Sequence, residues 1–320
     1  MPNTTQPPFI PPLHELQHQV VRDLAWCCFS AQLMQELPES DAINLPIDRD
    51  KLWPWLMDID QQPDALNEEI ASLKSTRLGI YYEALWRFYF SHHPDWELLQ
   101  HNLQVQRGGI TLGAFDFLCR RGDEYWHIET AVKFYLCDAR NENDAKEWHH
   151  WIGPNSEDRL DLKLSRLRQH QLPLHKTPEA RAQLHALYPD VKEWKTGLCV
   201  QGYLFSPIAT QYRPAFSHKN HGAGYWWHLQ NFLHFLDGIK DTQWIIVERQ
   251  YWLSPTQTKK AWELISNENL IHHLQKHVGQ MKRPLLLAAQ IKAESNDQLW
   301  QEVWRGFVVP DNWPDKPEKT

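Results

Sequence analysis

The segment 110–136 constrains the fold of this chain more than any other, because two apolar halves flank a short polar break. The break, Arg120-Arg121-Gly122-Asp123-Glu124, contains the glycine that a tight turn needs. Apolar and aromatic runs on both sides of such a turn are typical of two antiparallel strands. We therefore expect a β-hairpin around which the rest of the chain is organised.

The alternation of side chains along a strand sorts the charges of this hairpin onto one face. On the first strand Asp116 lies between Phe115 and Phe117, so we expect both rings on one face and the carboxylate on the other. The second strand separates into a polar face (His127, Glu129, Ala131, Lys133) and an apolar face (Ile128, Thr130, Val132, Phe134). Burying charge is costly unless each group has a partner or a metal. The polar face therefore has the composition of a functional site.

A helical tract before the hairpin contributes one more acid. Residues 65–93 have helical periodicity, with a possible break at Gly79, and Glu83 is the lone acid in the aromatic part RLGIYYEALWRFYF. An exposed pair with Arg87 would make Glu83 a minor surface contact. The surrounding aromatic residues instead predict burial, where a carboxylate needs stronger compensation.

The remaining periodicities predict a mixed α/β protein. Residues 13–37 predict a helix, 38–63 an irregular Pro-broken cover, and 96–106 and 196–205 strands. Asp158 is a plausible N-cap for a basic helix over 159–172. Further on, a helix is expected over 228–236, followed by strands at WIIVERQYWL, PLLLAAQI and RGFVVP. We divide the chain into an N-terminal cover (1–66), an α/β core (67–207) and a C-terminal α/β extension (208–320).

Composition excludes several classes of protein. A hydrophobic content of 42% excludes a disordered chain, and no stretch approaches the roughly 20 apolar residues of a membrane span. The five cysteines lack zinc-site or disulfide spacing, which favours a cytoplasmic protein with reduced thiols. The net charge of −7 argues against a uniformly basic nucleic-acid-binding surface. Without a GxGxxG, P-loop, GxSxG or HExxH pattern, dinucleotide and ATP enzymes are poor candidates.

The order of the charged residues resembles the PD-(D/E)XK nuclease superfamily. In that superfamily a helix-borne acid precedes a hairpin whose first strand carries Asp and whose second carries Glu or Asp and then Lys, as Glu83, Asp116, Glu129 and Lys133 do here. The segments RLGIYYEALWRF, TLGAFDFL, WHIETAVKFYL, WLSP and RGFVVPDNW also resemble the bacterial domain-of-unknown-function family 1853. The first resemblance implies a restriction-endonuclease-like mixed sheet with an αβββαβ core.

The superfamily resemblance also implies a chemistry. It assigns Asp116, Glu129 and Glu83 to a Mg²⁺ or Mn²⁺ site and Lys133 to the charge that develops on a scissile phosphate of DNA or, less readily, RNA. Lys163, Arg159 and Arg166 on the following helix would hold backbone phosphates. His127 is either a proton-transfer group or a structural histidine. The pattern departs from the superfamily at Ala131, where Lys is usual; a β-bulge could restore Lys133 to that place.

Two other interpretations of the same residues remain open. The protein could be a non-catalytic nucleic-acid-binding or assembly protein with a degenerate site, of which Ala131 would be the mark. Alternatively, the charges could form one buried ion-pair network without any ligand. The arrangement of the Glu83, Asp116 and Glu129 carboxylates around one pocket, with the Lys133 ammonium beside it, would distinguish the nuclease interpretation from these two.

Overall fold

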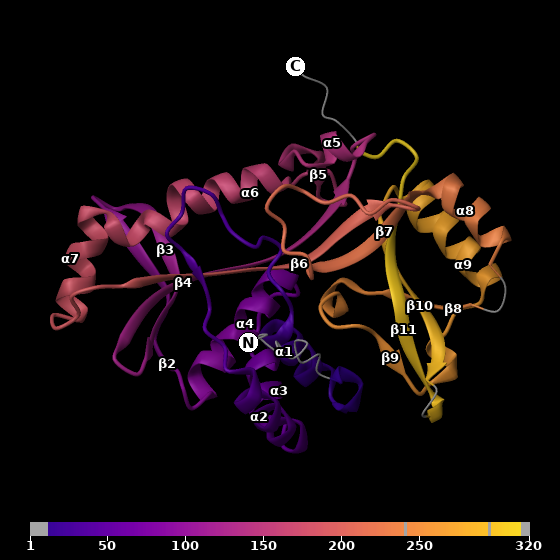
Figure 1. Cartoon of the computed structure of the whole chain (residues 1–320). Coiled ribbons are helices and arrows are strands. Elements are labelled where there is room, and N and C mark those ends of the chain that lie inside the picture. The colour runs from indigo at the N-terminus through magenta and orange to yellow at the C-terminus, as the bar shows by residue number, and fades with distance from the viewer. Residues whose placement is uncertain (1–11, 240–241, 294–295, 315–320) are drawn as a thin grey trace, which may run out of the picture.

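The centre of the molecule is one mixed β-sheet (Figure 1), seen in a computed structural model that describes residues 12–239, 242–293 and 296–314. Its main path runs β2-β3-β4-β6-β7-β11-β10-β8, with three short strands attached to it. The strands of this path are β2 (Glu97–Arg107), β3 (Ile110–Arg121), β4 (Glu124–Cys137), β6 (Lys195–Pro207), β7 (Gly222–His228), β8 (Gln243–Val247), β10 (Leu285–Ala293) and β11 (Asn296–Val309). The attached strands are β1 (Ile43–Asn44), β5 (Trp151–Ile152) and β9 (Gln257–Thr258).

The sheet combines antiparallel ends with a parallel middle. The hairpin strands β2, β3 and β4 are antiparallel, while β4, β6, β7 and β11 pair in parallel, and β10 and β8 are antiparallel again. Parallel neighbours need a long crossover, and helices fill the connection from β4 to β6. The predicted mixed α/β class is therefore confirmed, and one sheet continues from the predicted core into the C-terminal segment.

Helices cover both faces of the sheet. Figure 1 shows it bent over α1 (Gln19–Phe29), α2 (Arg49–Gln61), α3 (Asp64–Ala71) and α4 (Leu78–His92). The opposite face of β3, β4 and β6 packs under α6 (Leu160–Arg166) and α7 (Pro178–Leu187), with the short α5 (Glu142–Ala145) before them. The outer face of β8, β10 and β11 packs against α8 (Leu229–Asp237) and α9 (Asn267–Leu274).

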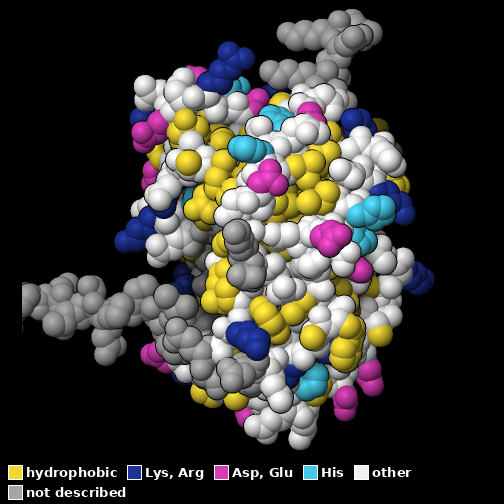
Figure 2. Space-filling view, turned by 90° about the vertical axis from the view of Figure 1, so that its right-hand side faces the viewer, with side chains coloured by type: hydrophobic (Ala, Val, Ile, Leu, Met, Phe, Trp, Pro, Cys, Tyr) yellow, Lys and Arg dark blue, Asp and Glu magenta, His cyan; other side chains and the backbone are white. Residues whose placement is uncertain are grey.

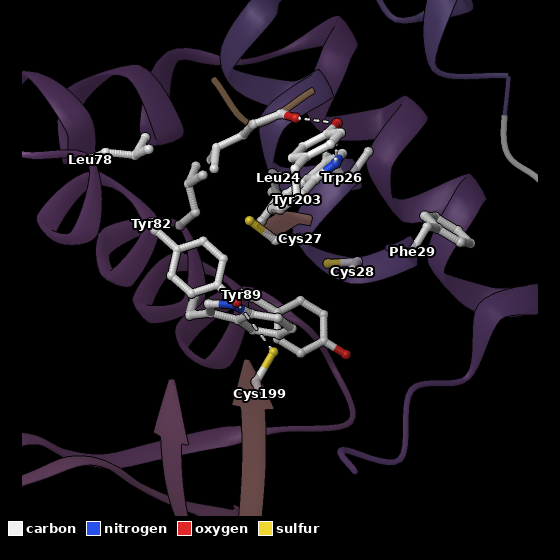
Figure 3. Close-up of a cluster of buried hydrophobic side chains, with 14 of the residues drawn as sticks. Leu24, Trp26, Cys27, Cys28, Phe29, Leu78, Tyr82, Tyr89, Cys199 and Tyr203 are labelled. Atoms are coloured by element: carbon white, nitrogen blue, oxygen red, sulfur yellow. Dashed lines mark hydrogen bonds between the residues drawn. The ribbon is translucent and has the colours of Figure 1, made fainter. Parts of the chain in front are cut away.

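The core between α1, α4 and β6 contains aromatic rings and thiols (Figure 3), and the buried Gln201 amide hydrogen-bonds within it. The Tyr82 hydroxyl donates to Gln201 Oε1 over 2.7 Å and lies 3.4 Å from the sulfur of Cys199. The Gln201 amide donates in turn to the carbonyls of Cys27 and Ser30. All five cysteines of the chain are buried and free. The amide thus ties the N-terminal helix to the middle of the sheet.

A second buried polar connection joins the N-terminal helix to the C-terminal strands. Arg305 on β11 is 2% exposed and donates to Glu302 and to the carbonyl oxygens of Trp252 and Ser254. The Ser254 hydroxyl donates to the Asp23 carboxylate of α1 over 2.7 Å. Since every charged group in this chain of contacts has partners, its burial is compensated.

The face formed by β8, α8 and α9 exposes apolar surface. Figure 2 views the side of β8, α8 and α9 and shows hydrophobic side chains gathered in the upper half of that face. Partly buried members of the cluster under these helices include Leu233, Phe235 and Trp304. None of the helices in the described ranges has the length and apolar composition to cross a membrane.

Several predicted elements differ from the structure. The segment 38–63 contains the helix α2 despite Pro54, because Leu52 and Leu56 lie one turn apart and both are fully buried. The tract 65–93 is two helices that separate at residues 72–77, before Gly79. The predicted helix over 13–37 is shorter, since α1 ends at Phe29. Residues 1–11 of the predicted N-terminal cover lie outside the described residues.

The connection from β4 to β6 also differs from its prediction. Asp158 does not cap α6, since Arg159 is the N-cap residue and the carboxylate of Asp158 binds other groups. The helix α7 was not predicted, although Thr177 caps it in the usual way by accepting from the Ala180 N–H, with Pro178 in the first turn. The two helices together form the cover over the polar face of β4.

Candidate functional site

The candidate site lies where the hairpin opens. Pairing between β3 and β4 extends from the turn only to Phe117 and Ile128, after which β4 continues beside β6. Asp116 and Glu129 occupy the next positions along the two diverging strands. The order of these residues in the sequence therefore places two acids opposite each other at the opening of the hairpin.

The predicted faces of β4 are confirmed. Ile128 and Phe134 pack in the core with α1 and α4, whereas Ala131 packs in the cluster under α6. The first strand behaves differently, because Phe117 belongs to the α4 core and Phe115 to the cluster under α7. The prediction that both rings share one face was wrong.

The difference arises where β3 parts from β4, and an irregular residue of β2 lies opposite the same point. Asn102, which the register places opposite Asp116, has a φ of 51°, outside the extended range. The regular alternation is interrupted at that point. As a result, Asp116 lies between two cores rather than opposite two rings of one core.

Asp116 is held by the backbone of β4. Its Oδ2 accepts the Thr130 N–H over 2.9 Å, and its other oxygen accepts no hydrogen bond from the described residues. Burial and the charge of Glu129 raise the pKa of Asp116 to about 7, against the lowering effect of the Thr130 hydrogen bond. A nearby positive charge would favour the ionised form of this carboxylate.

Glu129 is fully buried and has a hydrogen bond on each oxygen. Its Oε1 lies 2.8 Å from His127 Nε2, and its Oε2 accepts the Gln171 amide over 2.6 Å. Burial raises the pKa of Glu129 to about 7 and lowers that of His127 to about 4. The imidazole is therefore neutral at pH 7, and its contact with Glu129 is a hydrogen bond rather than an ion pair. Because His127 Nδ1 is buried without a partner, we assign the ring proton to Nε2.

Glu83 approaches the same region from α4. Its Oε1 lies 2.6 Å from His101 Nε2 on β2, and its charge raises the pKa values of both Asp116 and Glu129. None of the three acids has a Lys or Arg within ion-pair distance among the described residues. Glu83 therefore interacts electrostatically with Asp116 and Glu129, and the contacts of the three acids in the described part of the chain are to histidines, an amide and backbone N–H groups.

The predicted lysine does not complete this group. The Lys133 ammonium binds the Asp158 carboxylate, which also accepts the Tyr135 hydroxyl over 3.3 Å. The ladder between β4 and β6 keeps one register from Trp126 to Leu136, so a β-bulge does not move Lys133 toward the acids.

Lys163 of α6 is a cation whose charge interacts with those of the acids. Burial and the charge of Lys133 lower the pKa of Lys163, and the charges of Asp116 and Glu129 raise it by a smaller amount, so its pKa is lowered overall. Its Nζ donates to Gln171 Oε1 over 3.1 Å, and the same amide donates to Glu129. Gln171 ends a π-helical turn, Leu167–Gln171, that continues α6. Such turns often re-aim side chains at functional sites.

Gln171 and His101 were not singled out from the sequence. Each contacts an acid through a segment whose orientation depends on the folded chain: the π-helical turn for Gln171 and the irregular strand β2 for His101. Of the predicted phosphate-binding residues, Arg159 forms a two-pronged pair with Asp161, and Arg166 is exposed.

The donor atoms around the acids are mostly satisfied by protein. Within the described ranges, no three His, Cys, Asp or Glu side chains are arranged to hold a metal ion. Glu129 is bound to a histidine and an amide and Glu83 Oε1 to a histidine, which leaves Asp116 Oδ1 and Glu83 Oε2 without a hydrogen-bond partner among the described residues. A small site of one or two carboxylates completed by water is the kind that these residues fit.

Comparison with known families identifies the chain. A family model described as "Domain of unknown function (DUF1853)" matches residues 22–309, which include every residue of the candidate site. The chain belongs to the DUF1853 family. No curated protein and no solved structure matches this DUF1853 chain. The function of the DUF1853 chain therefore has to be argued from the acids and the surface around them.

Proposed function

We propose that the chain is a metal-dependent phosphodiesterase that cleaves nucleic acid, with DNA as the preferred substrate. The observation that carries this proposal is the pair Asp116 and Glu129 at the opening of the hairpin. Their charges repel each other without a Lys or Arg in ion-pair contact among the described residues. Two carboxylates in such a place are stabilised by a bound cation.

The residues fit Mg²⁺ or Mn²⁺ better than a metal that needs a full protein cage. Mg²⁺ takes oxygen ligands, keeps several waters and often uses one or two carboxylates plus substrate phosphate. Asp116 and Glu129 would hold the ion. Glu83 would contact the ion indirectly, through a water molecule bound to Glu83 or to His101. When bound, the ion supplies positive charge to the phosphate and lowers the pKa of a coordinated water.

The chain's own groups supply the remaining functions. Lys163 replaces Lys133 as the ammonium that stabilises charge on the phosphate, because the ammonium of Lys133 is bound to Asp158. Gln171 positions both Lys163 and Glu129. Neutral His127 orients the Glu129 carboxylate through its Nε2–H, which is a positioning role.

The order of the elements supports the same proposal. The elements α4, β2, β3, β4, α6 and β6 follow one another in the order expected of a PD-(D/E)XK core, and the acids occupy the expected elements. A cytoplasmic location, predicted from the reduced thiols, belongs to this proposal.

The test is nicking of supercoiled plasmid by purified protein with Mg²⁺, with Mn²⁺ and with excess EDTA. Wild-type protein should nick in either metal and not in EDTA, and Asp116→Asn should abolish nicking. Glu97→Gln is the matched control, because Glu97 is a carboxylate of the neighbouring strand β2 that binds Arg120 at the surface, away from the acids. Equal activity of Asp116→Asn and wild type would refute the proposal.

One observation favours a second function, that of a non-catalytic nucleic-acid-binding or assembly protein. Both oxygens of Glu129 already have hydrogen-bond partners, and Lys133 is bound to Asp158, as in a site that has lost its metal. This alternative predicts no heat of Mn²⁺ binding in calorimetry, and nucleic-acid binding that persists in EDTA without any nicking in Mg²⁺ or Mn²⁺.

A further inference from the structure

A basic cavity lies beside the acids, on the same face of the sheet. Its volume is about 670 Å³, within the range of roughly 300–1,000 Å³ typical of ligand-binding clefts. The walls come from the end of the segment 172–176, from α7, and from the segment 191–196 that leads into β6. Its charged side chains are the cations Lys176, Arg181, Lys192 and Lys195 and the acids Asp41 and Glu193, and His175 and His185 also line it.

Two of these cations are uncompensated. Lys176 binds Asp41, and Lys195 binds Glu124. Arg181 and Lys192 are exposed and have no ion-pair partner among the described residues, and against them stands one exposed, unpaired acid of the lining, Glu193, so the free cations still outnumber the free acid. In a chain with a net charge of −7, such a local excess of positive charge indicates an anionic ligand.

An aromatic side chain in the same cavity adds a second kind of contact. Trp194 is partly buried and is held by two edge-to-face contacts, with Tyr125 and Tyr188, whose ring centroids each lie 5.6 Å away. A fixed indole between cations is the arrangement on which unpaired bases stack, while the cations hold the neighbouring phosphates.

The cavity is connected to the acids by two histidines. His175 lines the cavity, and its ring centroid lies 5.6 Å from that of His127, which contacts Glu129. Burial lowers the pKa of His175 to about 4, so both rings are neutral at pH 7. The two neutral rings therefore lie between the basic cavity and the acids.

The helix from which phosphate contacts were expected has little free charge. Arg159 is paired with Asp161, Arg168 with Glu39, and Lys163 is directed to Gln171 near the acids. Only Arg166 of that set is exposed without an ion-pair partner in the described part of the chain. The uncompensated cations are instead those of the basic cavity.

We propose that the basic cavity binds an unpaired strand of nucleic acid, with Arg181 and Lys192 on its phosphates and Trp194 against a base. The concave shape admits a single strand, whereas a duplex presents its bases only inside the stack. The inference rests on the proposed function for the nature of the polyanion, and it locates the strand beside the acids.

The experiment measures binding of a fluorescein-labelled 20-mer of deoxythymidine by anisotropy in excess EDTA, using the full chain with Asp116→Asn so that cleavage cannot interfere. Adding R181E and K192E should weaken binding at least 10-fold at about 0.1 M salt. It should also reduce the slope of log Kd against log salt by about 1.4, because each single-strand phosphate contact contributes about 0.7. The control K259E/K276E makes the same change in net charge at exposed lysines of the C-terminal segment and should bind within twofold of the parent.

The opposite results would overturn the inference. They are unchanged binding by R181E/K192E, an equal loss in K259E/K276E, binding of a duplex as tightly as the single strand, or no binding by the parent. If the charge reversal lowers the melting temperature, the neutral pair R181Q/K192Q replaces it, with a smaller loss of affinity expected. Because the assay contains no free metal, cavity-dependent binding without any nicking by wild type would refute the proposed catalysis and leave this inference standing.

Discussion

The ionised carboxylate of Asp116 should lower the free energy of unfolding, and Asp116→Asn should raise it again. The pKa of this carboxyl is about 7 in the folded chain against 3.8 for the exposed group. At ~1.36 kcal/mol per pH unit the difference corresponds to about 4 kcal/mol. Since the folded pKa is the higher one, stability is fully present below pH ~4 and is lost as the pH rises through 7.

The size of the expected gain in stability depends on how well the amide of the variant accepts the hydrogen bond that the Asp116 carboxylate accepts. Asn retains an oxygen for the Thr130 N–H, and the weaker acceptor costs about 1 kcal/mol, so the variant should be about 2–3 kcal/mol more stable than wild type at pH 8. For 320 residues, at ~2.1 cal/mol/K each, this is a rise of about 3–5 °C in Tm. At pH 4.5 the two proteins should agree within about 1 kcal/mol.

Differential scanning calorimetry in EDTA at both pH values measures this difference directly. A second scan with Mn²⁺ should raise the Tm of wild type, by an amount equivalent to about 2.7 kcal/mol at 100 times Kd, and leave the variant unchanged. A variant that is less stable than wild type at pH 8, or a difference that does not depend on pH, would show that Asp116 is not a buried and repelled carboxylate.

Three further predictions concern the rest of the site and the fold. Lys163→Met should reduce metal-dependent nicking at least 100-fold, while Lys133→Met reduces it less than 10-fold; the reverse order would return the catalytic role to Lys133. Arg305→Met should lower the free energy of unfolding in urea by about 3–5 kcal/mol, because it leaves a buried carboxylate and several carbonyl oxygens without their donor. Gly202→Ala should prevent soluble expression, since a Cβ there would meet the Lys133 carbonyl oxygen at 1.7 Å, whereas Gly79→Ala in α4 has open space and should raise the Tm slightly.

The two strands of the hairpin show how far the sequence determines the site. On β4 the alternation of apolar and polar residues is regular, and it correctly sorted Glu129 and Lys133 away from Ile128. On β3 the same rule failed at Phe115, at the point where β3 parts from β4 and where Asn102 on the neighbouring strand β2 has a φ of 51°. A single strand pattern has no information about its neighbour's backbone.

The pairing of Lys133 with Asp158 and the electrostatic coupling of Lys163 to the acids were not predictable for a related reason. Each of the two lysines lies near acids in the sequence. Which ammonium comes close to the acids depends on where α6 lies over the sheet and on the π-helical turn that follows it. The strand β7 was hidden by composition, since Gly222 and Gly224 weaken a strand pattern. The glycines are needed there because a Cβ would come within 2.4 Å of the Gly202 carbonyl oxygen and 2.5 Å of the Phe205 ring.

The position of β11 has a consequence for how the molecule is assembled. This strand is the last in chain order of those described, yet it lies inside the sheet, between β7 and β10. During synthesis the edge of β7 therefore stays unpaired until residues 296–309 leave the ribosome. A chain that is truncated before residue 296 lacks an interior strand of the sheet rather than an edge strand. We expect chaperone dependence and loss on truncation to concentrate in that late interval of synthesis.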